Sequence, residues 1–471
     1  MRLIKKGTQL NLKIDSLAYG GQGVSRYNGI VIFTKNVLPG ETVLVKIIKK
    51  NKNYLEAIPI ETIKKSPFEN KEKCMHFLDC GGCQTQNLIY EEQLNQKYNQ
   101  VIDALNHITN IKSININPII KSELIFEYRN KMEFSFSNQR WLISSEKDNK
   151  NEKSKKFALG LHPPKRFDKI VDIDNCDIQS KLSNKILQSL KKEVIKYNLE
   201  PYDIIKHKGF LRNVVIKHSK YANELMINIV TAYENQNSLA PVVKKIKSIS
   251  KDIKSIINTI NKKKADVFVG EDKFLLYGQD TISEKLNEFE FKISPDSFFQ
   301  PNSTQALKMY DHIKNECNLN GQQIIYDFYC GTGTISIFLA KNAKKVYGFE
   351  IIEAAIEDAY ANAKKYNVNN CEFYCGDLSK ILINYKNIIK KNVCDILILD
   401  PPRAGLHSKT IKEIFTINPK KIIYASCNPT TQARDVREFI NYGYIMGCIQ
   451  PIDMFPHTHH IECVITLEKN D

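Results

Sequence analysis

The chain has 471 residues, of which 68 are Lys or Arg and 52 are Asp or Glu, so its net charge is +16. This length exceeds what one hydrophobic core usually holds and indicates about three domains. The sequence contains no run of about 18 apolar residues and begins without the apolar stretch of a secretory signal, so we expect a cytoplasmic protein with no membrane span. The positive charge favours a polyanionic partner such as RNA, although solvated lysines alone can produce it.

Short alternating segments separated by turns fill residues 1–62. Strands are predicted at about 10–14, 29–33 and 41–47, and the glycine-rich stretch 19–24 reads as a turn. No helix follows these glycines, which excludes a nucleotide-binding loop there. The pattern predicts a small β-barrel.

Three cysteines, Cys74, Cys80 and Cys83, lie close together, and Cys176 is isolated downstream. In a reducing cytoplasm, grouped cysteines more often bind metal or perform chemistry than form disulfides. Their spacing is neither that of a zinc finger nor that of a radical adenosylmethionine enzyme. Three interpretations stay open: four thiolates around a 4Fe-4S cluster, a zinc site, or reduced cysteines without a ligand. Most of the later cysteines lie in apolar runs, where we expect inert core residues.

Residues 63–285 form a second predicted region. Helical periodicity extends over about 91–107, and β-rich segments dominate from about 120. Residues 144–156 are charged and poor in apolar side chains, so we expect a mobile, solvated insertion.

Strands and helices alternate in the third predicted region, 286–471, which is typical of a parallel sheet. The expected strands are 323–328, 345–349, 372–375, 394–399 and 421–425, with helices at 334–343 and 353–366.

The loop 330–334 (CGTGT) joins the first of these strands to the first helix and contains two glycines. Glu350 ends the second strand, where a carboxylate can accept hydrogen bonds from ribose hydroxyls. Asp377 and Asp400 end the third and fourth strands. A complete G-x-G-x-x-G motif is absent, so S-adenosylmethionine is favoured over NAD. Arg403 follows Asp400 and two prolines, where amino-methyltransferases carry an aromatic residue, which argues against that class.

Cys427 follows the apolar run 421–425. In doubly wound α/β domains the carboxyl ends of the strands face the ligand crevice, so this thiol can be a nucleophile, although a core cysteine is the plainer alternative. Glu462, further along the chain, offers a carboxylate as its acid–base partner.

Four segments carry a family resemblance: 327–334 (DFYCGTGT), 400–406 (DPPRAGL), 426–435 (SCNPTTQARD) and 454–462 (MFPHTHHIE). Together they resemble the RNA 5-methyluridine methyltransferases, and most of all the iron–sulfur branch that modifies 23S ribosomal RNA. The resemblance covers nearly the whole chain in matching order. It includes a similarity of the N-terminal barrel to the TRAM domain, an RNA-binding module.

The resemblance implies a Rossmann-like class I methyltransferase domain, an N-terminal OB-like TRAM barrel and a central β-rich iron–sulfur domain. It implies that the helix at about 88–110 packs with the methyltransferase domain, and that the protein is a monomer. Cys427 is then the nucleophile and Glu462 the base. The expected cofactor contacts are Gln300, Tyr329, Glu350, Asp377 and Asp400, and the expected ligands of a 4Fe-4S cluster are Cys74, Cys80, Cys83 and Cys176. Some members carry Asn at the positions of Thr334 and Asp377.

The expected chemistry begins with addition of the Cys427 thiolate to carbon-6 of uracil, which activates carbon-5 toward the methyl group of adenosylmethionine. A base then removes the carbon-5 proton. Arg403 is a candidate for lowering the pKa of the thiol. Phe298 and Phe299 could hold a flipped uracil, or could be ordinary core aromatics. Two alternatives are a tRNA 5-methyluridine methyltransferase, against which the cysteine cluster argues, and a non-catalytic RNA-binding protein.

Overall fold

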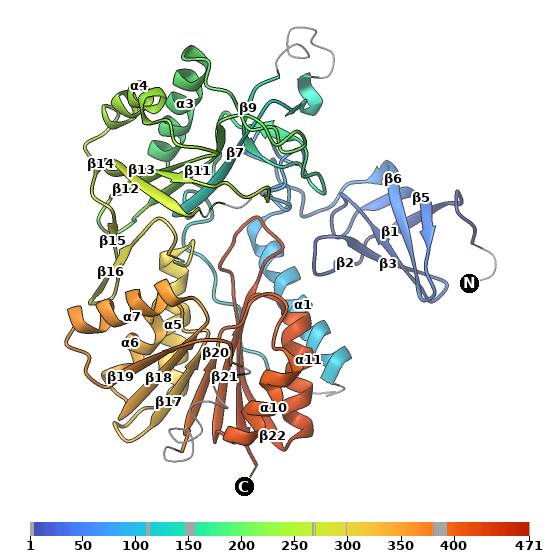
Figure 1. The fold of residues 1–471 in the computed structure, drawn as a ribbon. Helices are drawn as coiled ribbons and strands as arrows, with labels where there is room; N and C mark the ends of the chain where they lie inside the picture. Colours follow the sequence, from blue (N-terminus) through green and yellow to red (C-terminus); the bar gives the residue numbers. More distant parts are fainter. Residues whose placement is uncertain are drawn as a thin grey trace. The chain divides into compact units, whose positions relative to one another are not determined.

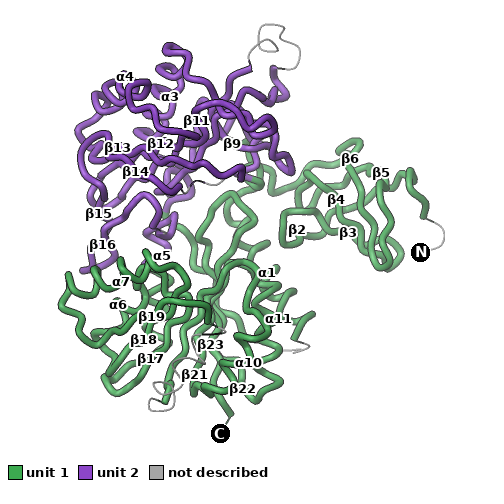
Figure 2. The backbone as a smooth tube through the Cα atoms, viewed as in Figure 1, with its two compact units in different colours: residues 1–72, 84–123, 308–471 green, residues 73–83, 124–307 purple. Residues whose placement is uncertain are grey.

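The computed structural model describes residues 4–109, 114–146, 156–265, 268, 270–297, 299–378, 380 and 393–470. The chain divides into two compact units (Figure 2). The first unit comprises residues 1–72, 84–123 and 308–471, and the second comprises 73–83 and 124–307. Both units are discontinuous in sequence, whereas the boundaries expected at 62/63 and 285/286 stay predictions.

A small β-barrel forms the N-terminal part of the first unit (Figure 1). Its strands are β1 (Gln9–Lys13), β2 (Ser16–Leu17), β3 (Gly23–Tyr27), β4 (Ile30–Thr34), β5 (Thr42–Lys50) and β6 (Tyr54–Lys64), in the sheet order β1-β5-β6-β4-β3-β2. Side chains that alternate along these strands, among them Leu12, Ile32, Val43 and Leu55, are buried in its core. The predicted barrel is confirmed.

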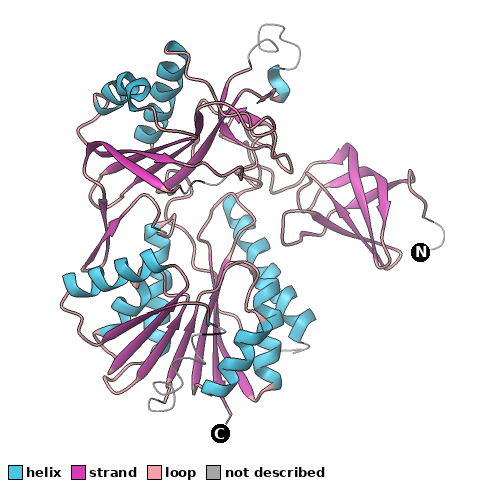
Figure 3. Cartoon of the chain, viewed as in Figure 1, coloured by secondary structure: helices cyan, strands magenta, loops and turns pink. Residues whose placement is uncertain are grey.

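The C-terminal part of the first unit is a seven-stranded sheet, counted over the described residues, with helices on both sides (Figure 3). Its strands are β17 (Ile324–Phe328), β18 (Lys345–Glu350), β19 (Cys371–Cys375), β20 (Ile396–Leu399), β21 (Lys421–Ser426), β22 (Tyr444–Ile452) and β23 (Glu462–Lys469). Its helices are α5 (Ser303–Cys317, of which 308–317 belong here), α6 (Thr334–Ala340), α7 (Glu353–Lys365), α10 (Ser408–Ile417) and α11 (Pro429–Asn441). The strand order is β19-β18-β17-β20-β21-β23-β22, and the predicted α/β domain is confirmed.

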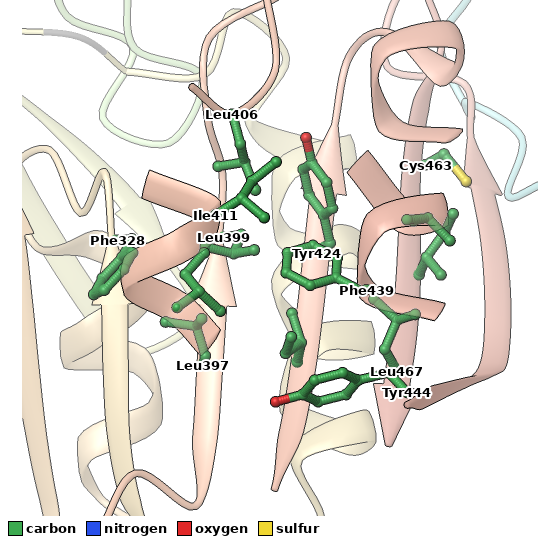
Figure 4. Close-up of a cluster of buried hydrophobic side chains, with 14 of the residues drawn as sticks. Phe328, Leu397, Leu399, Leu406, Ile411, Tyr424, Phe439, Tyr444, Cys463 and Leu467 are labelled. Carbon is green, nitrogen blue, oxygen red and sulfur yellow. The ribbon is translucent and has the colours of Figure 1, made fainter. Parts of the chain in front are cut away.

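Apolar side chains from the central strands and the covering helices make the core of this sheet (Figure 4). Tyr424 of β21 and Phe439 of α11 are both fully buried. Parallel strands covered on both faces bury nearly every residue, which explains why the sequence of β20 and β21 is almost continuously apolar.

Helix α1 (Tyr90–Thr109) confirms the helix predicted at 91–107 and packs against α11. Its buried face is unusual because it is mostly polar. The buried polar side chains are Glu92, Gln93, Gln96, Lys97 and Gln100. Such groups are stable inside a protein when they are hydrogen-bonded.

The second unit contains an eight-stranded sheet, within the part of the chain that is described, with the order β14-β13-β12-β11-β7-β9-β10-β8. Its strands are β7 (Lys131–Ser137), β8 (Arg140–Trp141), β9 (Ala158–Leu161), β10 (Ile170–Asp172), β11 (Leu211–His218), β12 (Leu225–Thr231), β13 (Ile253–Ile260) and β14 (Asp272–Gly278). Helices α3 (Lys181–Lys196) and α4 (Gln236–Lys247) pack together, and β15 (Ile282–Leu286) pairs with β16 (Phe289–Ile293). The β-rich character predicted for this region is confirmed.

The insertion predicted at 144–156 lies mostly outside the described residues, apart from a short 3-10 helix at Ser144–Glu146 and residue 156. In the described part of the chain, the model has no helix with the length and apolarity that crossing a bilayer requires.

Candidate active site

One edge of the seven-stranded sheet gathers most of the predicted site residues. Strands β17, β18, β19, β20 and β21 run parallel, so their carboxyl ends meet at this edge. The residues at or just after these ends are Tyr329, Glu350, Asp377, Asp400 and Cys427. Ligands of open α/β sheets bind outside the carboxyl ends of the strands.

Glu462 reaches the same edge by a different route. Strand β23 is antiparallel to β21, with Ser426 opposite Cys463. Glu462 is the first residue of β23, so it lies opposite Cys427, one residue beyond that pair. The sequence predicted the partnership of the two residues but not the strand that produces it.

The loop after β17 adopts a backbone that brings its peptide groups to this edge. Tyr329, Gly331 and Gly333 have φ values of 65°, 54° and 76°. A side chain at Gly333 would lie 2.9 Å from Phe373, whereas a Cβ at Gly331 would have no atom within 4 Å. The backbone of Gly331 therefore faces open space in which a ligand could lie close to the chain.

Three backbone amides hold the Glu350 carboxylate, and one of them belongs to this loop. Gly331 N donates to its Oε2 at 3.2 Å, and Ile351 N and Ile352 N donate to its Oε1 at 2.7 and 3.1 Å. The carboxylate is therefore oriented, and a carboxylate can accept further hydrogen bonds, as recognition of a ribose requires.

Carboxyl groups make this edge strongly acidic. Burial raises the pKa of Asp400 to about 6. Burial, with the charges of Asp400 and Glu350, raises the pKa of Asp327 to about 7, although Ser336 donates to Asp327 Oδ2 at 2.6 Å. Asp327 Oδ1 is buried and has no hydrogen-bond partner in the described residues. Such a site suits a cationic ligand, and S-adenosylmethionine carries a sulfonium and an ammonium.

Asp327 contributes a buried carboxyl to this edge, and the sequence prediction did not include it. It belongs to the quoted segment 327–334, but it lies inside β17 and reads as part of a core strand. An acidic residue in an otherwise apolar strand was the signal that could have revealed it, because buried carboxylates are rare without a function.

The thiol of Cys427 is half-buried between β21 and α11. Burial, Glu462 and Asp400 together raise its pKa to about 11, and Arg403 opposes this shift through its charge and a hydrogen bond. Arg403 thus acts in the expected direction but is outweighed. A pKa in this range favours the protonated thiol at neutral pH.

The pKa of the Glu462 carboxyl is shifted in the same direction. Burial and the charge of Asp400 raise its pKa well above the usual value, and Arg403 lowers it only in part. The side chain is 6% exposed, so water stabilises its charge poorly. Asp400 therefore raises the pKa of both predicted catalytic groups.

Hydrogen bonds connect the residues that follow Cys427 to the backbone of Arg403. Asn428 caps α11 through its side chain, and its Nδ2 also donates to the carbonyl of Arg403 at 3.1 Å. Thr431 Oγ1 donates to the same carbonyl at 3.2 Å. The Arg403 guanidinium lies 3.2 Å from His460 Nε2. The arginine is consequently fixed beside the thiol.

Gln300 and Phe299 belong to the second unit. Asn130 Nδ2 donates to the carbonyl of Gln300 at 3.0 Å. Phe299 is buried, with its ring centroid 6.2 Å from that of Phe291, as expected for a core aromatic. Phe298 lies outside the described residues.

The four early cysteines all belong to the second unit. The pKa of Cys176 is raised by burial and by the neighbouring thiolates of Cys83, Cys80 and Cys74, which shows that the four sulfurs face a common region. Burial raises the pKa of Cys80 to about 12. Cys80 and Cys176 are buried, and Cys74 and Cys83 are partly buried. A metal centre would stabilise the deprotonated form of such thiols.

A closely spaced group of potential metal ligands also lies in the first unit. Among the described residues, His312, Glu316 and Cys448 have side-chain ligand atoms within 4.8 Å of one another, whereas no three of the four early cysteines do.

This fold, with its glycine loop and acidic strand edge, defines an α/β methyltransferase that uses S-adenosylmethionine. The family model described as tRNA (Uracil-5-)-methyltransferase matches residues 134–470, and the TRAM domain model matches residues 4–60. The chain belongs to the tRNA (uracil-5-)-methyltransferase family, whose members are RNA methyltransferases.

Similar proteins extend over nearly the whole chain. An uncharacterized RNA methyltransferase of Chlorobaculum tepidum is 36% identical, over 94% of this chain and 92% of its own. One from Bacteroides thetaiotaomicron is 36% identical, over 96% and 100%. The solved structure of the Pyrococcus abyssi tRNA (uracil-54, C5)-methyltransferase, in complex with S-adenosyl-L-homocysteine, is 30% identical, with a TM-score of 0.74 over 97% of this chain and 100% of that one.

Proposed function

We propose that this protein methylates carbon-5 of a uridine in 23S ribosomal RNA, with Cys427 as nucleophile and Glu462 as general base. The observation that carries the proposal is the position of these two residues opposite each other at the strand edge, beside Asp400. S-adenosylmethionine, when bound, supplies an electrophilic methyl group on its sulfonium. Tyr329, Glu350, Asp377 and Asp400 are the residues proposed to hold it in this unit.

The roles of the two residues follow from the chemistry of uracil. The Cys427 sulfur forms a bond to carbon-6, and the electron pair of the 5,6 double bond makes carbon-5 nucleophilic. After carbon-5 has gained the methyl group, Glu462 takes the proton from carbon-5, and the returning electron pair expels the thiolate. A uridine in structured RNA must leave its stack to reach the thiol.

The ionisation of this site depends on the bound cation. In the ligand-free protein, Asp400 raises the pKa values of Cys427 and Glu462. A positive charge beside Asp400 offsets this effect and favours the thiolate and the carboxylate. The reactive state would therefore form when the methyl donor is present.

Ribosomal RNA is proposed as the substrate because of the four cysteines. Cys74, Cys80, Cys83 and Cys176 are proposed to hold a 4Fe-4S cluster, and the influence of the other three thiols on the pKa of Cys176 supports a shared site. The second candidate substrate is tRNA, since the similar Pyrococcus abyssi protein acts on uridine 54 of tRNA.

Two experiments test the proposal. Cys427→Ala should abolish methyl transfer and covalent capture of RNA, whereas Cys448→Ala removes another half-buried thiol of this unit and should retain both. Methylation by Cys427→Ala at the wild-type rate would exclude Cys427 as the nucleophile. Mapping 5-methyluridine in RNA from a deletion strain identifies the substrate: loss from 23S ribosomal RNA supports the proposal, and loss from tRNA alone establishes the second candidate.

A further inference from the structure

The N-terminal barrel contributes a side chain to the strand edge that carries Cys427. Tyr19 lies between β2 and β3, and its hydroxyl donates to the carbonyl oxygen of Cys427 at 3.1 Å. Its ring meets that of His459 edge-on, with centroids 5.9 Å apart and planes at 85°. Burial and the charges of Cys427 and Glu462 raise the pKa of Tyr19, so the hydroxyl stays a donor.

Buried hydrogen bonds fix the barrel segment that bears Tyr19. Leu17 N donates to Gln96 Oε1 of α1 at 2.7 Å, and Gln100 Nε2 donates to the carbonyl of Leu17 at 3.0 Å. Leu17 itself is buried and packs with Leu38 and Leu88. Tyr19 therefore approaches Cys427 from an anchored segment.

Helix α1 connects this anchor to the segment that precedes β23. Its Lys97 Nζ donates to Asp453 Oδ1 at 2.6 Å, and Gln93 Nε2 lies 3.2 Å from His457 Nδ1. The polar face of α1 is explained by these contacts, because it bonds the barrel on one side and the 453–457 segment on the other. A change at the barrel can thus act on the catalytic edge through ordered contacts.

We infer that Tyr19 is a positioning residue for Cys427, through which the RNA-binding barrel becomes part of the catalytic centre. Its hydroxyl fixes the peptide between Cys427 and Asn428, and Asn428 is fixed on its other side by the Arg403 carbonyl. The orientation of that peptide sets the direction of the thiol. The inference rests on the proposed role of Cys427 as nucleophile.

The size of the expected effect follows from geometry. Attack on carbon-6 requires the sulfur within a few tenths of an ångström of its best position, and a small displacement of a reacting group costs much of the rate. Loss of one neutral hydrogen bond corresponds to a change of up to about tenfold. We therefore expect Tyr19→Phe, which keeps the ring, to lower the single-turnover methylation rate about tenfold.

The test compares Tyr19→Phe with Tyr98→Phe. Tyr98 donates a matched bond, from its hydroxyl to the carbonyl of Ile116 at 3.1 Å, away from the strand edge. For each full-length variant, the single-turnover rate, the affinity for RNA and the melting temperature are measured. The pH profile of Cys427 alkylation by iodoacetamide, without RNA, is followed by peptide mass spectrometry.

A slower rate and a shifted alkylation profile in Tyr19→Phe alone, with unchanged RNA affinity and melting temperature, support the inference. An unchanged rate and profile overturn it, and so does a loss confined to RNA affinity. If Cys427→Ala proves active, the nucleophile assignment fails separately, whereas the alkylation profile still reports whether Tyr19 controls that thiol.

Discussion

Glu462 lies opposite Cys427 across the antiparallel pair β21–β23, and its carboxylate raises the pKa of the Cys427 thiol. The two groups are therefore coupled before any substrate binds. A negative Glu462 opposes formation of the thiolate, and a protonated Glu462 permits it. In the proposed reaction, Cys427 acts first by adding to carbon-6, and Glu462 acts second by taking the carbon-5 proton.

Glu462→Gln should trap the covalent protein–RNA adduct, because the amide cannot accept the carbon-5 proton and the thiol is not released. A band that survives denaturing electrophoresis with RNA and S-adenosylmethionine is expected. Glu468→Gln, on the same strand but paired with Lys421, should turn over normally. Normal turnover by Glu462→Gln would contradict the role of Glu462.

The ionisation of Cys427 should depend on the charge of the bound cofactor analogue. Because its pKa is raised to about 11, the thiolate fraction, and with it the alkylation rate, should rise with pH from 7 to 9. Sinefungin, which carries an amine where the sulfonium lies, should lower the apparent pKa of the thiol. S-adenosylhomocysteine, which is neutral at that atom, should have less effect. Identical pH profiles of alkylation with both ligands would show that the charge of the ligand does not alter the pKa of Cys427 through Asp400.

Glu350→Gln should weaken binding of S-adenosylmethionine about 10- to 100-fold, because hydrogen bonds to a charged group are among the stronger ones. Isothermal titration calorimetry measures this, with RNA affinity expected to stay constant. Glu353→Gln alters an exposed carboxylate at the start of α7 and serves as the control. Equal affinities for both variants would remove Glu350 from the cofactor site.

Lys97→Met should destabilise the protein by about 3–5 kcal/mol, since it removes the cation beside the buried Asp453 carboxylate, which keeps a hydrogen bond from the Tyr90 hydroxyl. The two side chains are 3% and 0% exposed. Urea unfolding followed by far-ultraviolet circular dichroism gives the change in the free energy of unfolding. Lys65→Met breaks an exposed pair with Glu69 and should leave the midpoint unchanged. If Lys97→Met lost as little stability as Lys65→Met, groups other than Lys97 would be stabilising the Asp453 carboxylate.

Cys176→Ser should lose iron and sulfide from protein purified without oxygen, because a cluster would lack one of its four ligands. The wild type and Cys375→Ser, which alters an exposed cysteine at the end of β19, should both be brown and contain iron. Wild-type protein that is colourless and contains only zinc would refute the cluster.

Local sequence determined much of this protein. Apolar runs and the glycine loop predicted β17 to β21 with their order along the chain, and the residues that follow these strands gave the candidate cofactor and nucleophile positions. These features depend on neighbouring residues: glycine permits the turn after β17, and strands buried on both faces are continuously apolar. The positive charge favoured a polyanionic partner, and the family resemblance of the four segments implied RNA.

Only the tertiary structure decided which distant residues meet. The antiparallel β23 places Glu462 opposite Cys427. The polar face of α1 holds the barrel segment that bears Tyr19, and the Tyr19 hydroxyl donates to the carbonyl oxygen of Cys427. Burial, together with the charges of Asp400 and Glu350 at other strand ends, raises the pKa of Asp327. Strand order, register and the burial of charges arise from pairings between remote segments, and no local pattern of side chains encodes them.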